Sequence, residues 1–349
     1  MKNRRSFLKK SGLLLGATAS VAPQFSFDIV KTKKKDGKIV GQGNFKYRVN
    51  KEWGVQDFSK IPVKNCHEMV QDKQGRLILL TDEVKNNVIF YDRSGKVLKT
   101  WGDQFPGAHG LTLWSEGGEE FLFITDTVKR QVYKATLDGK ILLTIDYPKE
   151  SGVYESNEKF KPTETTIAPN GDIYVADGYG SNYISVFDSK GKFKFHFGGK
   201  GDEDGLFDCC HGITLDTRQK EHNTLLITSR SANKFKRFTL DGKHIETISI
   251  PGMWPCRPVI KGKDLYFAII VTQSWWDYDG FIAAFDMNNK LISAPGANTE
   301  MNADGTITKA TYDGQTFLSP HDVCVDNDMN LYIPQWMSGK TYPVMLERQ

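Results

Sequence analysis

Four of the seven histidines in this chain begin similar short apolar segments. The segments read H-E-M-V-Q-D from His67, H-G-L-T-L-W from His109, H-G-I-T-L-D from His211 and H-D-V-C-V-D from His321. Imidazoles that converge from separate strands are the usual ligands of borderline transition metals, zinc above all, and three protein ligands leave one position open for chemistry. The alternative is that these histidines hydrogen-bond only to water and carbonyl groups. The residue type and number favour a metal.

The histidine segments belong to a repeat with a period of roughly 50 residues, which is typical of propellers. Two further copies lack the histidine: T-E-T-T-I-A from Thr163 and C-R-P-V-I-K from Cys256. Each copy continues with a polar turn, two more apolar segments such as L-I-L-L and V-I-F-Y-D, and a turn such as R-S-G-K before a last segment. Four short strands joined by glycine-containing turns make one antiparallel blade. The sequence therefore predicts an all-β, six-bladed propeller.

The sixth copy contains only three of the four strands, and a matching strand lies at the other end of the chain. The segment F-K-Y-R-V-N-K-E-W-G, residues 45–54, resembles K-V-L-K-T-W-G at residues 96–102. We expect it to complete the last blade and close the ring, which removes exposed strand edges. An open β-solenoid, the main alternative, would not need this strand. In a closed propeller the first strand of each blade lines the channel, so the four histidines would face one another.

The first 22 residues are typical of a removable export signal. They consist of a basic stretch, an apolar run G-L-L-L-G-A-T-A and small residues, and the run is too short to anchor the protein in a membrane. The pair Arg4-Arg5 followed by S-F-L-K closely resembles a bacterial twin-arginine signal, with an ordinary secretion leader as the alternative. This predicts a periplasmic or otherwise exported protein, with the twin-arginine translocase as a partner during export and no stable membrane insertion after the signal is removed.

The remaining chain divides into a linker and one domain. Residues 23–43, with the charged run K-T-K-K-K-D-G-K, are expected to be a linker, and residues 44–349 the propeller. The formal net charge is +4, and removing the five basic residues of the leader leaves 4 − 5 = −1. Nothing in this charge favours a nucleic acid as a partner.

Three of the five cysteines lie within three residues of these histidines in the sequence. They are Cys66, Cys210 and Cys324. Five is an odd number, so at least one thiol is unpaired or pairs between chains. The C-C-H triplet, Cys209 to His211, could be a vicinal disulfide, could supply an extra thiolate ligand, or could hold buried thiols, which is the default.

The repeat and its histidines resemble the NHL-repeat group, and within it the catalytic propeller of peptidyl-α-hydroxyglycine α-amidating lyase. The resemblance covers about Asn44 to Arg348. It implies a six-bladed propeller that holds zinc through three histidines and a structural calcium in the channel. It also implies cleavage of a C-terminal α-hydroxyglycine into an amide and glyoxylate.

The resemblance also carries over individual residues by their motifs. The implied zinc ligands are His109, His211 and His321. The implied calcium ligands are the side chain of Asp322 and the backbone carbonyls of Met69 and Leu111. Independently of the resemblance, the carboxylate of Asp322 is a hard oxygen ligand that suits calcium.

The resemblance also implies a catalytic tyrosine and a substrate-binding arginine. The tyrosine matches Tyr179 in V-A-D-G-Y-G-S-N, and the arginine matches Arg230 in I-T-S-R-S. Beside a metal that polarises a hydroxyl or carbonyl, a tyrosine could take or give a proton and an arginine could hold a carboxylate. The alternatives are that Tyr179 only caps a turn and that Arg230 is a surface charge.

Three positions depart from the family pattern. Asp82 stands where the family has a second arginine, and Ser319 where it has methionine before P-H-D. A carboxylate at Asp82 would repel a peptide carboxylate, which argues against the family's own substrate. His67 is additional, and this fourth imidazole could bind the metal or act as a catalytic acid or base near neutral pH.

We therefore predict an exported, lyase-like enzyme that depends on zinc and calcium. Its substrate would be a small hydroxylated or carboxylated molecule, derived from a peptide or a glycan, that binds in the channel. One alternative is a non-enzymatic NHL-type propeller that binds a glycan or protein. Another is a metal-dependent lactonase or sugar-acid hydrolase. The aromatic segments 274–280 and 335–342 could contribute to a ligand site, although Trp275 and Trp336 could equally pack in the core.

Overall fold

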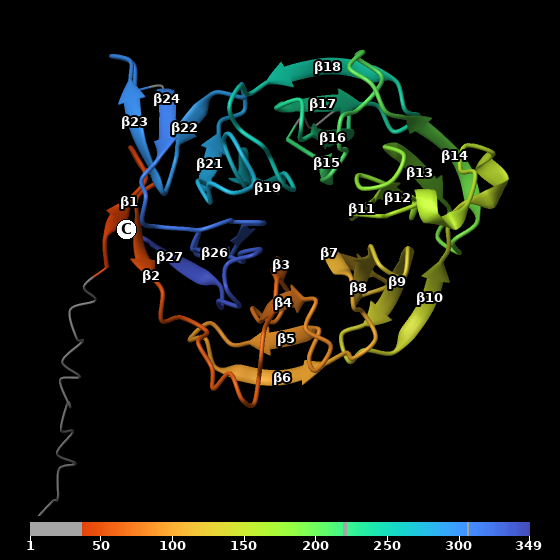
Figure 1. The fold of residues 1–349 in the computed structure, drawn as a ribbon, viewed down its shortest axis with the longest axis horizontal. Helices are drawn as coiled ribbons and strands as arrows, with labels where there is room; N and C mark the ends of the chain where they lie inside the picture. The colour runs from red at the N-terminus through yellow and green to blue at the C-terminus, as the bar shows by residue number, and fades with distance from the viewer. Residues whose placement is uncertain (1–36, 219–221, 306) are drawn as a thin grey trace, which may run out of the picture. The chain divides into compact units, whose positions relative to one another are not determined.

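The computed structural model describes residues 37–218, 222–305 and 307–349. These residues form six antiparallel sheets arranged around a common centre and one further two-stranded sheet, and Figure 1 shows the ring viewed down its centre. The predicted all-β six-bladed propeller is confirmed. The described helices are two short 3-10 turns, Lys149–Ser151 and Asn157–Lys159, and no described helix is both long and apolar enough to cross a membrane.

Each of the first five blades is a meander of four strands, numbered from the centre outwards. Blade 1 contains β3 (Cys66–Gln71), β4 (Leu77–Thr81), β5 (Val88–Tyr91) and β6 (Val97–Trp101). Blade 2 contains β7 (Ala108–Glu116), β8 (Glu119–Asp126), β9 (Gln131–Thr136) and β10 (Ile141–Ile145). Blade 3 contains β11 (Glu164–Ile167), β12 (Ile173–Ala176), β13 (Tyr183–Phe187) and β14 (Phe193–Gly198).

Blades 4 and 5 follow the same order, and one additional hairpin follows blade 5. Blade 4 contains β15 (Ile213–Asp216), β16 (Thr224–Ser229), β17 (Lys234–Phe238) and β18 (His244–Ser249). Blade 5 contains β19 (Val259–Lys261), β20 (Asp264–Ile269), β21 (Phe281–Phe285) and β22 (Leu291–Ser293). The hairpin, β23 (Ala297–Met301) with β24 (Ile307–Tyr312), was not predicted from the repeat.

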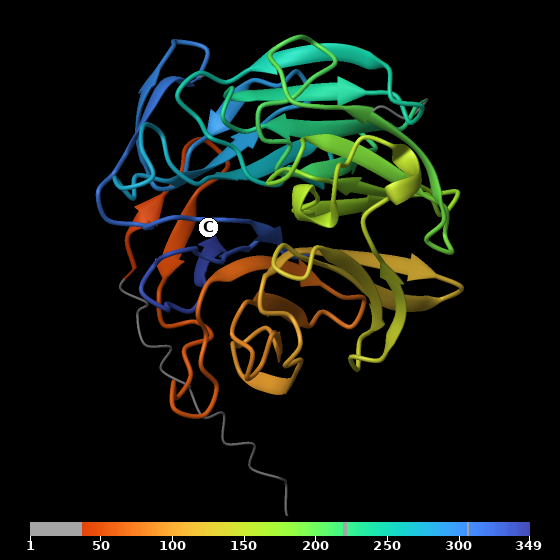
Figure 2. The same cartoon turned by 45° about the vertical axis from the view of Figure 1, so that its right-hand side comes forward.

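Blade 6 combines both ends of the described chain. It consists of β25 (Cys324–Val325), β26 (Leu331–Ile333), β27 (Val344–Arg348), β2 (Tyr47–Asn50) and β1 (Ile39–Val40). The antiparallel pairing of β2 with β27 sets Tyr47 opposite Arg348, and Figure 2 shows these strands side by side. The predicted closure of the ring by an N-terminal strand is confirmed.

The predicted N-terminal segments lie mostly outside the described residues. The export signal, 1–22, lies wholly outside them, and only 37–43 of the predicted linker are described. Within that part, β1 pairs with β2. The blade thus includes residues ahead of the expected start at Asn44.

Apolar residues on the inner and middle strands pack between neighbouring blades. Between blades 1 and 2, for example, Leu80 and Phe90 pack with Leu111 and Ile124, all fully buried. The outer strand β6 alternates half-buried and exposed residues, as expected where one face packs on the core and the other meets water. The inner strands β3, β7, β11, β15, β19 and β25 each contact the next, and β25 contacts β3. This ring of inner strands positions the residues described below.

The glycines predicted in the outer hairpins are required by their backbone conformation. Gly95 and Gly139 have φ values of +89° and +88°, in the left-handed region that favours glycine. A Cβ at Gly139 would also lie 2.8 Å from the ring of Trp101 in the preceding blade. These turns therefore set both the strand register and the spacing between blades.

Ring closure can be tested at Tyr47, which is fully buried and whose hydroxyl accepts a hydrogen bond of 3.0 Å from Arg348 Nη1. We expect Tyr47→Ala to lower the free energy of unfolding by about 3 to 5 kcal/mol, measured by urea denaturation. The control is Phe58→Ala, because Phe58 is 43% exposed and its loss should change stability by less than about 0.5 kcal/mol. Equal stability of the two variants would show that β2 does not close the ring in solution.

Candidate functional site

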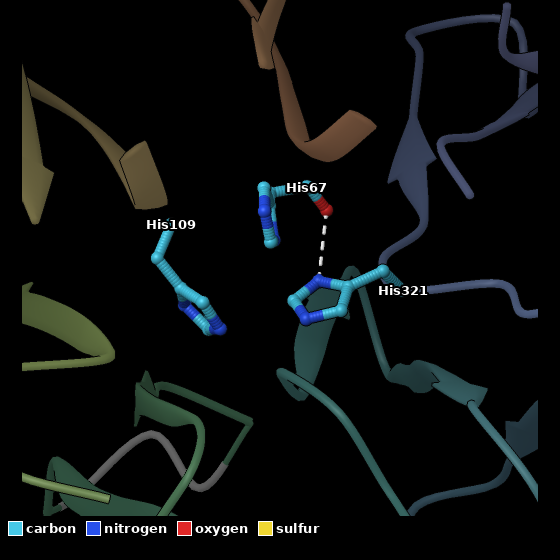
Figure 3. Close-up of side chains that lie close together, drawn as sticks. All are labelled: His67, His109 and His321. Atoms are coloured by element: carbon cyan, nitrogen blue, oxygen red, sulfur yellow. Dashed lines mark hydrogen bonds between the residues drawn. The ribbon is translucent and has the colours of Figure 1, made fainter. Parts of the chain in front are cut away.

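The first residues of the six inner segments form a layer at the centre of the ring. This histidine layer comprises His67, His109, Thr163, His211, Cys256 and His321, and all six residues are buried. The ring centroid of His109 lies 4.8 Å from those of His67 and His211 and 4.9 Å from that of His321. The structure thus brings together all four histidines that the repeat places in register. Figure 3 shows His67, His109 and His321 pointing toward one another.

Backbone carbonyls fix the orientation of two of these rings. Nδ1 of His109 lies 2.8 Å from the carbonyl oxygen of Thr163, and Nδ1 of His321 lies 3.0 Å from that of His67 (Figure 3). A carbonyl can only accept, so Nδ1 carries the proton in each ring and Nε2 keeps its lone pair when the ring is neutral. A hydrogen bond of this kind is the usual outer support of a metal-binding histidine.

Several ring nitrogens of the layer lack a partner. His321 Nε2, His67 Nδ1 and His211 Nδ1 are buried and have no hydrogen-bond partner among the described residues. His211 Nε2 lies 3.2 Å from His109 Nε2. Buried nitrogens without partners are costly, and a ligand bound to any of them would remove the cost for that nitrogen. The donor set fits a transition metal such as zinc.

Burial keeps these imidazoles neutral. It is the largest cause that lowers the pKa of His67 to about 3, followed by the positive charges of Lys64 and Arg230. Burial likewise holds the pKa values of His109, His211 and His321 well below the usual range. Neutral imidazoles are the form that binds metal. In the metal-free protein His67 is therefore neutral at pH 7 and has no imidazolium proton to donate. This favours a role for His67 as a metal ligand over a role as a catalytic acid or base.

Two overlapping sets of three histidines could hold the ion. The resemblance implies His109, His211 and His321, whereas the ligand atoms of His67, His109 and His321 all lie within 4.8 Å of one another. His211 completes the cluster through its close approach to His109. His67 is therefore an integral member of the site, although no family motif implies it.

Tyr179 and Arg230 lie beside this cluster. The Tyr179 hydroxyl is 3.2 Å from His109 Nε2 and accepts a hydrogen bond of 2.8 Å from Arg230 Nη2. Arg230 is 1% exposed, so it is not a surface charge. Its guanidinium lies 5.4 Å from the ring centre of Tyr179 and 5.3 Å from that of Trp275, within the range of cation–π attraction.

The tyrosine and the arginine affect each other's protonation. Desolvation of its hydroxyl raises the pKa of Tyr179 to about 12, and Arg230 opposes this rise. Burial works against the charge of Arg230, but Tyr179, Cys209 and Cys256 raise its pKa. At neutral pH the pair is therefore a phenol and a guanidinium cation, with the phenol able to donate a proton.

The turn that carries Tyr179 is anchored by Asp177. Its carboxylate accepts hydrogen bonds of 2.6 Å from the backbone N–H groups of Lys161 and Ser181. Asn182 completes the turn with φ +65°, a conformation that asparagine tolerates better than most residues. Tyr179 itself is 40% exposed, so its ring faces open space while its hydroxyl points to the histidines.

Asp82 has the same anchoring role in blade 1. It accepts hydrogen bonds of 2.9 Å from both the backbone and side-chain nitrogens of Asn65, and its carboxylate lies 3.4 Å from Lys64 Nζ. Asp126 and Asp177 likewise bind a backbone N–H just ahead of the inner strand in their own blades. The carboxylate that departs from the family pattern is thus partly neutralised by Lys64. Ser319, the other departure, is buried.

A cavity of about 430 Å³ adjoins the histidines. Its wall includes His67, His109, Tyr179 and Arg230, together with Lys64, Asp82, Trp275 and Trp336. Trp275 and Trp336 also pack against the core of blades 5 and 6, so both expectations for these aromatics hold in part. The volume is within the range of small-molecule sites.

The residues expected to bind calcium do not fit that ion, because a side chain already bonds to all of them. Arg257 donates to both carboxylate oxygens of Asp322, at 3.1 and 2.6 Å, to the carbonyl of Leu111 at 2.9 Å and to that of Met69 at 3.1 Å. In this arrangement the oxygens expected to bind calcium are therefore already bonded to a guanidinium. Arg257 was not singled out from the sequence, although it follows Cys256 at the position that Asp322 holds after His321.

All five cysteines are free. Cys209 and Cys210 form no disulfide, and burial raises the pKa of Cys210 well above its usual range. The Cys209 sulfur lies 3.7 Å from Arg230 Nη2. Within the C-C-H triplet, Cys210 is a buried thiol, as the default expectation had it, whereas Cys209 is half-buried.

Comparisons with known proteins agree with this fold. The family model DUF5128, described as a 6-bladed beta-propeller, matches residues 161–309. A streptogramin B lyase structure is similar with a TM-score of 0.55 and 17% identity, covering 82% of this chain and 95% of that one. A virginiamycin B lyase from Staphylococcus aureus gives 0.56 and 14%, covering 89% and 99%. The chain is a six-bladed β-propeller.

The sequence is also similar to proteins that are named as amidating lyases. The chain is 31% identical over 189 residues to peptidyl-alpha-hydroxyglycine alpha-amidating lyase 1 of Drosophila melanogaster, covering 53% of this chain and 29% of that protein. It is 32% identical over 162 residues to the probable amidating lyase pgal-1 of Caenorhabditis elegans, covering 45% and 40%. The matched region thus spans less than half the length of either relative. This is a modest similarity to amidating lyases.

The lowered histidine pKa values predict a pH-dependent stability for the metal-free protein. In the unfolded chain a histidine titrates near 6.5, so acid protonates the unfolded state first and the free energy of unfolding falls as the pH drops below that value. Each buried histidine adds about 1.4 kcal/mol per pH unit to this slope until its folded pKa is reached. We expect His67→Gln to have a shallower slope than wild type between about pH 6 and 4, measured by urea denaturation after metal removal.

The matched control for this experiment is His222→Gln, which changes an exposed histidine in a loop. It should keep the wild-type slope. A His67→Gln slope that equals that of wild type would mean that His67 is protonated as easily in the folded protein as in the unfolded chain.

Proposed function

We propose that this protein is an exported, zinc-dependent lyase that acts on a small hydroxylated or carboxylated substrate in the cavity beside the histidines. The observation that carries the proposal is the position of the Tyr179 hydroxyl, within hydrogen-bond distance of both His109 Nε2 and Arg230 Nη2 on the wall of that cavity. The similarity to proteins named as amidating lyases supports the same reaction class.

Zinc bound at the histidines would polarise a substrate hydroxyl or carbonyl and make its proton easier to remove. A lyase reaction also needs a proton for the atom that leaves. Tyr179 keeps its proton at neutral pH, with a pKa raised to about 12, and it lies beside the metal ligands, so it is placed to donate. The adjacent Arg230 stabilises the phenolate that remains, because it lowers the pKa of Tyr179 relative to burial alone.

Positive charge in the cavity suits a carboxylated substrate. Arg230 Nε has no hydrogen-bond partner among the described residues, whereas Lys64 on the cavity wall already lies 3.4 Å from the Asp82 carboxylate. The guanidinium fork matches a carboxylate. Asp82 stands where a second arginine is expected from the family resemblance, so the substrate need not be the α-hydroxyglycine peptide that the relatives' names specify.

The metal can be measured directly. We expect elemental analysis of the purified protein to find about one zinc per chain, and His321→Ala to lose most of it, because His321 Nε2 is a free buried ligand atom. His244→Ala is the control, since His244 lies on the outer strand β18 and bonds to Thr247. Zinc retained in full by His321→Ala, or absent from wild type even after zinc is added back, would contradict the proposal.

The role of Tyr179 can be tested by turnover. Peptides that end in α-hydroxyglycine and smaller α-hydroxy acids are the first substrates to assay, with release of glyoxylate or another carbonyl product as the readout. We expect Tyr179→Phe to lower kcat by about 10² to 10⁴ without loss of zinc. The control is Tyr183→Phe, on strand β13 of the same blade. Unchanged kcat in Tyr179→Phe would remove this residue from the mechanism, and no carbonyl product from any of these substrates would contradict a lyase.

A further inference from the structure

We propose that Arg257 is a built-in cation that replaces a structural calcium ion, so that the centre of this propeller is held together without bound calcium. The resemblance to amidating lyases implies calcium between the Asp322 carboxylate and the carbonyls of Met69 and Leu111. In this chain the Arg257 guanidinium bonds to all three groups. The inference is independent of the proposed catalytic activity.

The guanidinium satisfies the same kind of atoms that calcium prefers. Calcium takes carboxylate and backbone carbonyl oxygens. Arg257 offers five N–H donors in a planar fork. Nε and Nη2 engage both oxygens of Asp322, while Nη1 and Nη2 reach the carbonyls of Leu111 and Met69 at 2.9 and 3.1 Å. The oxygens directed to this point are therefore bonded without a metal.

Two further carboxylates surround this cation. Glu68 lies 3.5 Å and Glu164 3.8 Å from the guanidinium nitrogens, and both carboxylates are almost completely buried. Glu68 also accepts a hydrogen bond of 2.7 Å from the backbone N–H of Leu111 in the next blade, and Glu164 accepts one of 2.8 Å from the backbone N–H of Thr165, its neighbour in sequence. A buried carboxyl group is costly in its charged form unless positive charge lies beside it. Arg257 is the guanidinium that provides this charge within the described part of the ring.

The repeat register explains why one arginine can reach so many partners. Each of these residues follows a member of the histidine layer by one position, and together they form a charged layer of Glu68, Gly110, Glu164, Gly212, Arg257 and Asp322. The two glycines permit close packing, Gly212 against the backbone of Arg257 and Gly110 against that of Thr163. A Cβ at Gly212 would lie 2.6 Å from the Arg257 Cα, and one at Gly110 would lie 2.5 Å from the Thr163 carbonyl oxygen.

The first test uses the wild-type protein with zinc held at a fixed concentration, so that only calcium varies. After exposure to millimolar calcium and desalting, we expect elemental analysis to find far less than one calcium per chain. The melting temperature should change by less than about 1 °C when calcium is added or removed with a chelating resin. Tightly bound calcium near one per chain, with a melting temperature that falls on its removal, would overturn the proposal.

The second test makes the site dependent on calcium. Arg257→Gln leaves the carboxylates and carbonyls without their cation, so its melting temperature should fall by about 5 °C or more. Millimolar calcium should recover a large part of that loss, because Asp322, Glu68 and Glu164 then surround an uncompensated space. A folded Arg257→Gln protein that calcium does not stabilise would overturn the equivalence of the arginine and the ion.

The matched control is Arg237→Gln. Arg237 is also buried and pairs with Asp216 at 2.7 Å, but it lies on β17 of blade 4 and bonds to Glu246 and Thr224 rather than to channel residues. This variant should lose stability without any response to calcium. If Arg257→Gln does not fold at all, the wild-type measurement still decides the proposal, and the zinc content of wild type tests the catalytic proposal separately.

Discussion

The centre of the ring depends on the hydrogen bonds and ion pairs that the Arg257 guanidinium makes. It extends from blade 5 to Asp322 in blade 6, to Met69 and Glu68 in blade 1, to Leu111 in blade 2 and to Glu164 in blade 3. A hydrophobic interface between two blades joins only neighbours, whereas these bonds tie together inner strands on opposite sides of the ring. The histidine layer lies one residue away along the same strands, so the position of its imidazoles follows from this layer.

The charged layer and the histidine layer have different roles, the first structural and the second chemical. In the charged layer Arg257 donates to both Asp322 oxygens and to the carbonyls of Leu111 and Met69, and these bonds stabilise the ring. The histidine layer keeps buried nitrogens without partners and adjoins a cavity. The charged layer is thus held mainly by bonds within the protein, whereas the histidine layer has nitrogens available to a ligand, as expected of a rigid scaffold that presents a reactive site.

The repeat predicted most of the fold and the main members of the site. Period, turn glycines and the alternation of apolar segments were enough to predict six blades, closure by residues 45–54 and the register of His67, His109, His211 and His321. The β23–β24 hairpin was missed because it is an insertion outside the repeat. The role of Arg257 was missed because its partners are 65 to 188 residues away. Pairing across the ring cannot be read from local spacing, and it becomes visible only when the residue after each histidine position is compared between copies.

Ring closure also constrains how the chain folds. The strand that completes blade 6 comes from residues 47–50, and its partner, residues 344–348, comes at the opposite end of the described chain. Contacts between residues so distant in sequence slow folding, because a long loop must close before they form. During synthesis the first blades can assemble, but the edge of β2 that pairs with β27 stays unpaired until the last strand has been made. The complete propeller therefore forms only after the whole domain has left the ribosome. Any factor that covers the edge of β2 until then would affect the yield of folded protein.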